Sequence, residues 1–172
     1  MKVENLTKND VKKIEEEIKY RKLHVRPKAL EDVKTARAHG DLSENFEYYA
    51  AKKFNRENNS RIEYLEKMLK NANVIEVENK SCVSLEKMVK VKYVDENIDE
   101  ENWDIDIFKI VTSIRSDSLK KRISIESPLG KALVGKNVGE IATVNISNGS
   151  SYALKIISIE DADDDLDEIK QF

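Results

Sequence analysis

The sequence predicts an α+β fold, in which an N-terminal antiparallel coiled-coil helical hairpin is followed by a strand-rich globular domain. The hydrophobic period changes from about 3.5 residues in the first half to 2 in the second. Five glycines and two prolines among 172 residues, with 37% charged residues, are typical of long solvated helices. Charge is also divided, with 17 basic and 13 acidic residues up to position 75 and 13 against 20 thereafter. We therefore expect two units, 1–78 and 79–172.

The first helical stretch runs from Thr7 towards residue 38. Thr7 is a suitable N-cap, and Val11, Ile14 and Ile18 then repeat at spacings of 3 and 4. Pro27 interrupts this pattern, since a proline removes a backbone donor and disfavours helix at the preceding residue. The sequence therefore predicts a kink or a change of register near Pro27.

The second helical stretch has a regular seam, and Asn55 and Asn58 place amides in it, where they weaken packing and help to specify register. The seam positions alternate in steps of 4 and 3: residues 44, 48, 51, 55, 58, 62, 65, 69 and 72. Two helices joined near Gly40 must run antiparallel. About 30 residues per helix, at 1.5 Å each, give an arm of roughly 45 Å.

Strands are predicted in the second half by alternation of apolar and polar residues. The apolar positions are Val89, Val91 and Tyr93; Trp103, Ile105 and Ile107; Ile123 and Ile125; Val144 and Ile146; Leu154 and Ile156. A short helix is expected from Pro128 to Gly135, and NGSS at 148–151 predicts a hairpin turn. The final stretch, EDADDDLDEIKQF, reads as a solvated acidic tail, with a regulatory or charge-mimic role as the alternative.

Composition excludes several classes of protein. No run of about 18 apolar residues occurs and the start lacks a signal peptide's apolar core, so we expect a cytoplasmic protein without membrane contact. One cysteine and two isolated histidines do not make a structural zinc site. The acidic second half argues against clamping a phosphate backbone, which leaves at most a weak nucleic-acid contact.

The tip segment HGDLSEN, residues 39–45, carries two carboxylates with two interpretations. Asp41 and Glu44 have the spacing of a capping box that would begin the second helix. They also lie at the far end of a thin arm with no pocket behind them. Two carboxylates cannot satisfy the octahedral shell of Mg²⁺ alone, but they could complete a site that another macromolecule supplies. Such an ion would orient a water for attack on a phosphodiester.

The run ARAHGDLSENFEYYAAK, from Ala36 to Lys52, resembles the tip of the bacterial transcript cleavage factors GreA and GreB, close to AR-x-x-GDLSENAEY-x-AAK. The flanks LTKNDVKKIEEEI and RIEYLEKMLKNANVIE agree with that family. The segment SPLGKALVGKNVGE looks like its FKBP-like C-terminal domain. The resemblance implies an accessory factor that is not itself an enzyme and has no cofactor of its own. It would dock on RNA polymerase, insert its coiled coil into the secondary channel and stimulate the polymerase's cleavage of backtracked RNA.

The resemblance also assigns roles to individual residues. Asp41 and Glu44 would hold Mg²⁺ and water within the polymerase complex, and Ser43 and Asn45 would orient them. Arg37, Tyr48 and Lys52 would face the channel or the RNA 3′ end, with exposed helix or seam positions as the structural alternative. Ser127 and Pro128 would contact the polymerase rim, or simply begin a helix.

Two residues depart from the family pattern. Phe46 stands where a small residue is usual, and Tyr49 replaces a smaller or more polar one. They would alter the fit in the channel or pack against Val33 of the first helix.

Three other functions compete with cleavage stimulation. An anti-Gre-like inhibitor would use the same scaffold and channel, although the intact GDLSEN favours the cleavage factor. An FKBP-type isomerase or chaperone needs an aromatic-lined pocket, and the aromatics of the second half do not cluster in sequence. Coiled-coil oligomerisation is discouraged by Asn55 and Asn58, so we expect a monomer.

Overall fold

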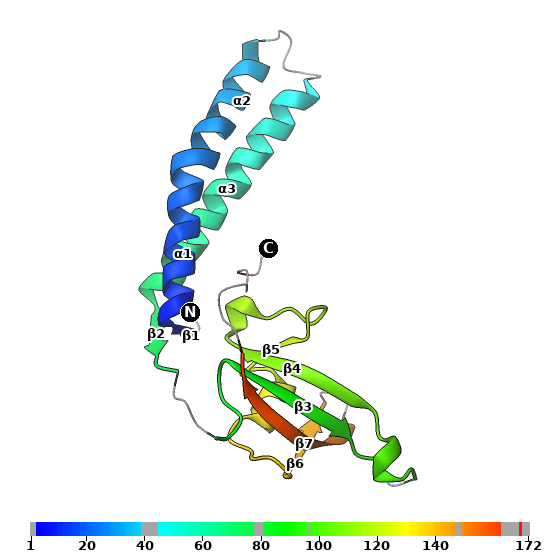
Figure 1. Ribbon diagram of the computed structural model, residues 1–172. Coiled ribbons are helices and arrows are strands. Elements are labelled where there is room, and N and C mark those ends of the chain that lie inside the picture. The colour runs from blue at the N-terminus through cyan, green and yellow to red at the C-terminus, as the bar shows by residue number, and fades with distance from the viewer. Residues whose placement is uncertain are drawn as a thin grey trace. The chain divides into compact units, whose positions relative to one another are not determined.

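The structure is a computed structural model that describes residues 3–38, 45–77, 81–95, 97–146, 149–162 and 169. The chain divides into two compact units, Met1–Val74 and Ile75–Phe172. The first is a helical hairpin and the second is built around a five-stranded sheet (Figure 1). The predicted α+β fold is therefore confirmed. None of the described helices is long and apolar enough to cross a bilayer.

The first limb of the hairpin is nearly continuous helix. Strand β1 (Glu4–Thr7) leads into α1 (Lys8–Tyr20), a π-helical turn η1 (Arg21–Val25) and α2 (Arg26–Ala38). Thr7 caps α1 as predicted, and the cap is reciprocal. The Thr7 hydroxyl accepts from the Asp10 N–H at 3.1 Å, and the Asp10 carboxylate accepts from the Thr7 N–H at 2.8 Å.

The π-helical turn is the register change that Pro27 predicts. The Arg26 N–H donates to the Arg21 carbonyl, five residues back, which inserts one extra residue into the helix. The original register would continue through Lys28, but the buried positions after the turn are Ala29 and Ala36. Because Pro27 cannot donate to the preceding turn, the helix widens there and the apolar stripe moves by one residue.

The second limb is α3 (Phe46–Lys70), which runs alongside the first limb (Figure 1). Its buried positions are Asn58, Arg61, Ile62, Leu65 and Met68, so the predicted seam is confirmed and widened by two residues. After α3, strand β2 (Ala72–Ile75) pairs with β1 in a two-stranded sheet at the root of the hairpin. The sequence did not predict this sheet.

A buried polar cluster crosses the seam where the π-helical turn begins. The Glu17 carboxylate accepts from the Arg61 guanidinium at 3.0 and 3.1 Å and from Arg21 at 2.6 Å. Arg21 also donates to the Asn58 side-chain carbonyl at 3.2 Å. Burial raises the pKa of Glu17, but the hydrogen bonds and charges of Arg61 and Arg21 hold it below its ordinary value of 4.5. Glu17 is thus the counter-charge for an arginine that is only 4% exposed.

Glu17→Gln should lower the free energy of unfolding by about 2 kcal/mol at pH 7, because two arginines in a partly buried site then lose the carboxylate that both of them contact. A carboxylate with a lowered folded-state pKa stabilises above its unfolded pKa and loses that effect as pH falls through the folded pKa. The difference between variant and wild type should therefore shrink below pH 4.5. Denaturant unfolding followed by circular dichroism at pH 7 and pH 3 tests this, with exposed Glu16→Gln as control. An unchanged difference at both pH values would contradict it.

The second unit holds the strands that the alternation predicts. They are β3 (Lys87–Tyr93), β4 (Ile105–Val111), β5 (Arg122–Ser124), β6 (Ile141–Asn145) and β7 (Ser151–Asp161), in the order β5-β4-β3-β7-β6. Strand β3 pairs antiparallel with β4 and β7, β6 pairs antiparallel with β7, and β5 runs parallel to β4. The β6–β7 hairpin is confirmed. Short 3₁₀ turns, η2 (Glu100–Asn102) and η3 (Ser113–Arg115), flank β4.

The core of this unit lies on one face of the sheet. Its buried residues are Val83, Val89, Val91, Phe108, Ile110, Leu133, Ala142, Val144, Leu154 and Ile156. Leu133 comes from the short helix α4 (Pro128–Leu133), which ends two residues before the predicted Gly135. Gly135 follows with φ of +83°, a conformation that ends helices at low cost for glycine.

Candidate functional site

The two limbs of the hairpin are tied together at its tip by Asn45. Its side-chain carbonyl accepts from the Tyr48 N–H at 3.0 Å and caps α3, while its amide donates to the Ala36 carbonyl near the end of α2 at 2.8 Å. One side chain therefore satisfies a first-turn donor of one helix and a last-turn acceptor of the other. Asn45 thus joins the end of the first limb to the start of the second.

Asp41, Ser43 and Glu44 lie outside the described residues. The structure does show where α3 begins, and it begins at Phe46 with Asn45 as its N-cap. The prediction that Asp41 caps this helix is therefore wrong. Asparagine is as good a cap as aspartate, and the extra bond from Asn45 to Ala36 favours the later start. Capping of α3 does not require Asp41 or Glu44.

Asn45→Ala should cost about 1–2 kcal/mol of stability, because the variant loses an N-cap and a bond between the limbs. Asn45→Asp is the matched control, since it keeps the capping acceptor and loses only the donor to Ala36. We expect it to lose about half as much. Thermal unfolding followed at 222 nm measures both, and an Asn45→Asp variant as stable as wild type would show that the bond to Ala36 contributes nothing.

The residues that the resemblance places towards the channel or RNA differ in how far they are exposed to solvent. Tyr48 is half-buried at the seam, its ring 5.7 Å from the Lys52 ammonium and 5.7 Å from the Tyr49 ring in an edge-to-face contact. Lys52 is exposed, as is Arg37 near the end of α2. The structure thus brings Tyr48 and Lys52 together as a cation–π pair.

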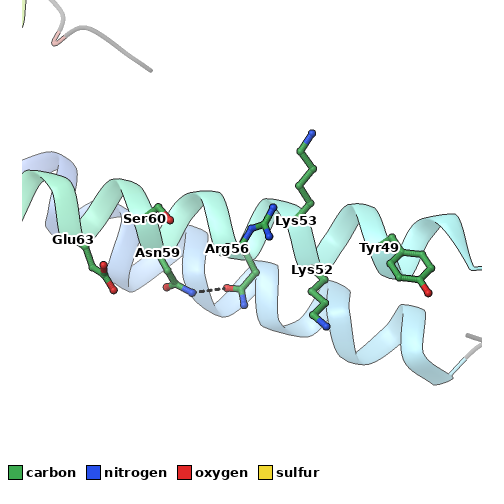
Figure 2. A pocket seen from close by; sticks show the side chains of 8 residues that line it. Tyr49, Lys52, Lys53, Arg56, Asn59, Ser60 and Glu63 are labelled. Carbon is green, nitrogen blue, oxygen red and sulfur yellow. Dashed lines mark hydrogen bonds between the residues drawn. The ribbon is translucent and has the colours of Figure 1, made fainter.

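A shallow groove of about 650 Å³ runs along α3, beside the seam (Figure 2). Tyr49 lies at its tip end and Glu63 at its root end, with Lys52, Lys53 and Arg56 between them. Figure 2 shows Lys53 projecting away from the neighbouring helix. Three cations and one carboxylate line this groove together with uncharged Asn55, Asn59 and Ser60, so its charge suits an anionic ligand.

Phe46 and Tyr49, the two departures from the family pattern, do not pack into the hairpin. Phe46 is 86% exposed and Tyr49 is 54% exposed. The suggestion that they pack against Val33 is therefore wrong. Both sit on the side of α3 opposite its seam, so their rings contribute little to the stability of the arm.

Ser127 and Pro128 begin helix α4 in the second unit. The Ser127 hydroxyl accepts from the Gly130 N–H at 3.0 Å and donates to the Ser124 carbonyl at 2.7 Å, while Pro128 is exposed at the first helical position. The helix-start interpretation is correct, and it leaves the Pro128 ring available at the surface.

Among the described residues, no group of three His, Cys, Asp or Glu side chains lies close enough to hold a metal ion. The two carboxylates of the tip segment, Asp41 and Glu44, are chemically suited to Mg²⁺ but supply too few oxygens. Any site at this tip would need ligands from a partner.

Comparison with known families matches both units. Residues 4–74 match the family model described as "Transcription elongation factor, N-terminal", and residues 78–161 match "Transcription elongation factor, GreA/GreB, C-term". Together these matches cover most of the chain, including the tip and the α4 surface.

Individual relatives span the same length. "Transcription elongation factor GreA" of Allorhizobium ampelinum is 38% identical over 154 residues, which is 90% of this chain and 94% of the relative. GreA of Rhizobium leguminosarum bv. trifolii is 41% identical over 147 residues, 86% and 90% of the two chains. Among solved structures, the GreA factor homolog 1 (Gfh1) protein of Thermus thermophilus is 20% identical, with a TM-score of 0.42 over 92% of this chain and 99% of that one.

Proposed function

Because this chain belongs to the GreA/GreB family of transcription elongation factors, we propose that it acts inside the RNA polymerase secondary channel and stimulates cleavage of backtracked RNA. In this proposal the polymerase remains the enzyme. The factor is an accessory protein whose arm delivers its tip to the polymerase active site.

The observation that carries the proposal is the position of GDLSEN in the hairpin. Helix α2 ends at Ala38 and α3 begins at Phe46, with Asn45 joining their ends. The motif therefore occupies the connection at the far end of two helices of 13 or more residues. An arm two helices wide buries only its seam, so its length serves reach more than stability.

Asp41 and Glu44 are the residues that we assign to the chemistry. Their carboxylates are hard oxygen ligands of the kind that Mg²⁺ prefers, and the polymerase would supply the remaining ligands. The ion, when bound, would activate a water for in-line attack on the RNA phosphodiester. This chain's part is to place two carboxylates at the scissile bond, with Ser43 and Asn45 orienting the tip.

RNA contact is supported by the charge of the arm. Lys52, Lys53 and Arg56 line the groove that starts about one helical turn from the tip, and Arg37 is exposed on the facing limb. Clustered cations attract the phosphates of a nearby RNA 3′ segment and make the contact salt-dependent. We place the RNA 3′ end along this side of the arm.

Docking is assigned to α4 in the second unit. Pro128 is exposed and Ser127 is held by two hydrogen bonds, so the surface that they form is rigid. A rigid surface loses little conformational entropy when it binds. We propose that this surface contacts the rim of the channel.

The test is an RNA cleavage assay with a stalled, backtracked elongation complex of the cognate polymerase. Addition of the factor with Mg²⁺ should shorten the RNA from its 3′ end and restore synthesis. RNA of unchanged length together with slower synthesis would instead identify an inhibitor that uses the same channel. Unchanged RNA and unchanged synthesis would contradict both. Proline-isomerisation activity of the full chain would support the isomerase alternative.

A further inference from the structure

An aromatic and basic stripe, which we define as Phe46, Tyr49, Lys53 and Arg56, runs along one face of α3. The spacings of 3, 4 and 3 residues keep all four side chains on the same side of a helix. The seam positions 48, 51, 55, 58 and 62 have the same spacing but lie on the opposite side. The stripe therefore faces away from the first limb, which agrees with the 86% and 54% exposure of its two rings.

The rings and charges of the stripe are accessible to a ligand. The Tyr49 ring is braced by the edge-to-face contact with Tyr48 at 5.7 Å, which limits its motion without covering it. Lys53 meets Glu57 at only 3.8 Å, with both side chains more than half exposed. Arg56 forms no ion pair with any residue that the structure describes. Two rings and two cations thus follow one another along about 15 Å of helix.

Exposed aromatic rings beside exposed cations fit single-stranded nucleic acid. Bases stack on the rings while the cations hold the backbone, and stacking requires a free base face that a duplex does not offer. A protein partner would be expected to cover apolar side chains, but the positions that follow the rings along the stripe are charged. The positive groove of Figure 2 adjoins the stripe and includes Tyr49, Lys53 and Arg56.

We propose that Phe46 and Tyr49 stack against bases of single-stranded RNA while Lys53 and Arg56 hold its phosphates. The inference rests on the proposed function for the source of this RNA, the 3′ segment extruded from a backtracked polymerase. Every base presents a π-face to an aromatic ring, so this stacking tolerates any RNA sequence. Phe46 and Tyr49 are then RNA-binding residues that distinguish this factor from relatives with smaller side chains at these positions.

The direct test is a titration of the full chain with oligoadenylate or oligouridylate, followed by NMR of the aromatic ring protons. Oligoadenylate should shift the Phe46 and Tyr49 rings upfield and leave Phe54 unmoved. Phe54 is 50% exposed on a different face of α3 and serves as the matched control. Phe46→Ala or Tyr49→Ala should weaken binding roughly 5-fold, and Phe54→Ala should not. Phe46 and Tyr49 rings that stay unmoved with both oligonucleotides would overturn the proposal.

Two further measurements distinguish base stacking from simple apolar contact and from failure of the proposed function. Tyr49→Leu keeps an apolar side chain without a ring, so it should bind as weakly as Tyr49→Ala. Wild-type affinity in Tyr49→Leu would mean apolar contact only and would overturn stacking. If the wild-type factor shortens RNA in the cleavage assay but oligoadenylate does not shift its Phe46 and Tyr49 ring signals, the proposed function holds and the stacking proposal is wrong. If oligoadenylate shifts the ring signals but the factor does not stimulate cleavage, the proposed function is wrong and the stacking surface is still supported.

Discussion

Asp41→Ala and Glu44→Ala should each lower the stimulated rate of RNA cleavage roughly 100-fold or more, since each removes a ligand from an ion that stabilises transition-state charge. Neither should weaken binding to the polymerase, because the proposed docking surface lies in the other unit. Neither should lower the melting temperature by more than about 1–2 °C, because α3 is capped by Asn45 and surface changes cost little. A large loss of activity with unchanged stability is the expected result.

The experiment combines three measurements on the same proteins: cleavage of backtracked RNA, competition with wild-type factor for the polymerase, and thermal unfolding. Glu17→Gln is the control for a purely structural effect, since it should lower stability while keeping both carboxylates and the tip residues that orient them. If Asp41→Ala lost stability as Glu17→Gln does and still stimulated cleavage, the carboxylates would be structural after all. The capping interpretation predicts that outcome, and the assignment of Asp41 and Glu44 to chemistry predicts the reverse.

Local signals in the sequence predicted the elements well, because the physics behind them is local. Thr7 caps α1 since its hydroxyl and the Asp10 carboxylate lie three residues apart, a relation visible in sequence. Pro27 shifts the apolar stripe because it lacks an N–H, and that defect acts within one turn. The alternation around Val89 and Ile156 gives strands because their inward faces share one core.

Features that depend on pairing between distant segments could not be predicted. Arg61 is buried because Glu17, 44 residues earlier, meets its guanidinium across the seam. The root sheet forms because β1 and β2 meet at the open end of the hairpin, and each is only four residues long. Sequence periodicity carries no information on which charge faces which, so these contacts need coordinates.

In the candidate site, too, the residues could be named from the sequence, but their contacts and exposure required the structure. The resemblance named Tyr48 and Lys52, and the structure adds that the Lys52 ammonium lies 5.7 Å from the centre of the Tyr48 ring. The sequence predicted Asp41 as the cap of the second helix, whereas the structure has Asn45 as the cap, with a hydrogen bond to Ala36 in the other limb. The stripe of Phe46, Tyr49, Lys53 and Arg56 has a regular spacing that was visible in sequence. Its functional meaning required the exposure of the two rings.

Gly130→Ala should destabilise the second unit by about 3 kcal/mol, at the upper end of the range for overpacking. A Cβ at this position would lie 2.0 Å from the Ser124 carbonyl oxygen and 2.9 Å from the Ile125 Cα, both backbone atoms that cannot rotate away. Helix α4 would have to lift from the end of β5. The bond from the Gly130 N–H to Ser127 would be strained, and Leu133 would leave the core.

The matched control is Gly139→Ala, which meets nothing within 4 Å and suffers only from its φ of +87°, about 1 kcal/mol. Unfolding followed by fluorescence of Trp103, the single tryptophan, reports on this unit. Because α4 carries Ser127 and Pro128, Gly130→Ala should also weaken competition for the polymerase, whereas Asp41→Ala should not. Equal stability losses in the two glycine variants would show that α4 accommodates the methyl group. Full competition by Gly130→Ala despite the predicted destabilisation would place the docking surface elsewhere.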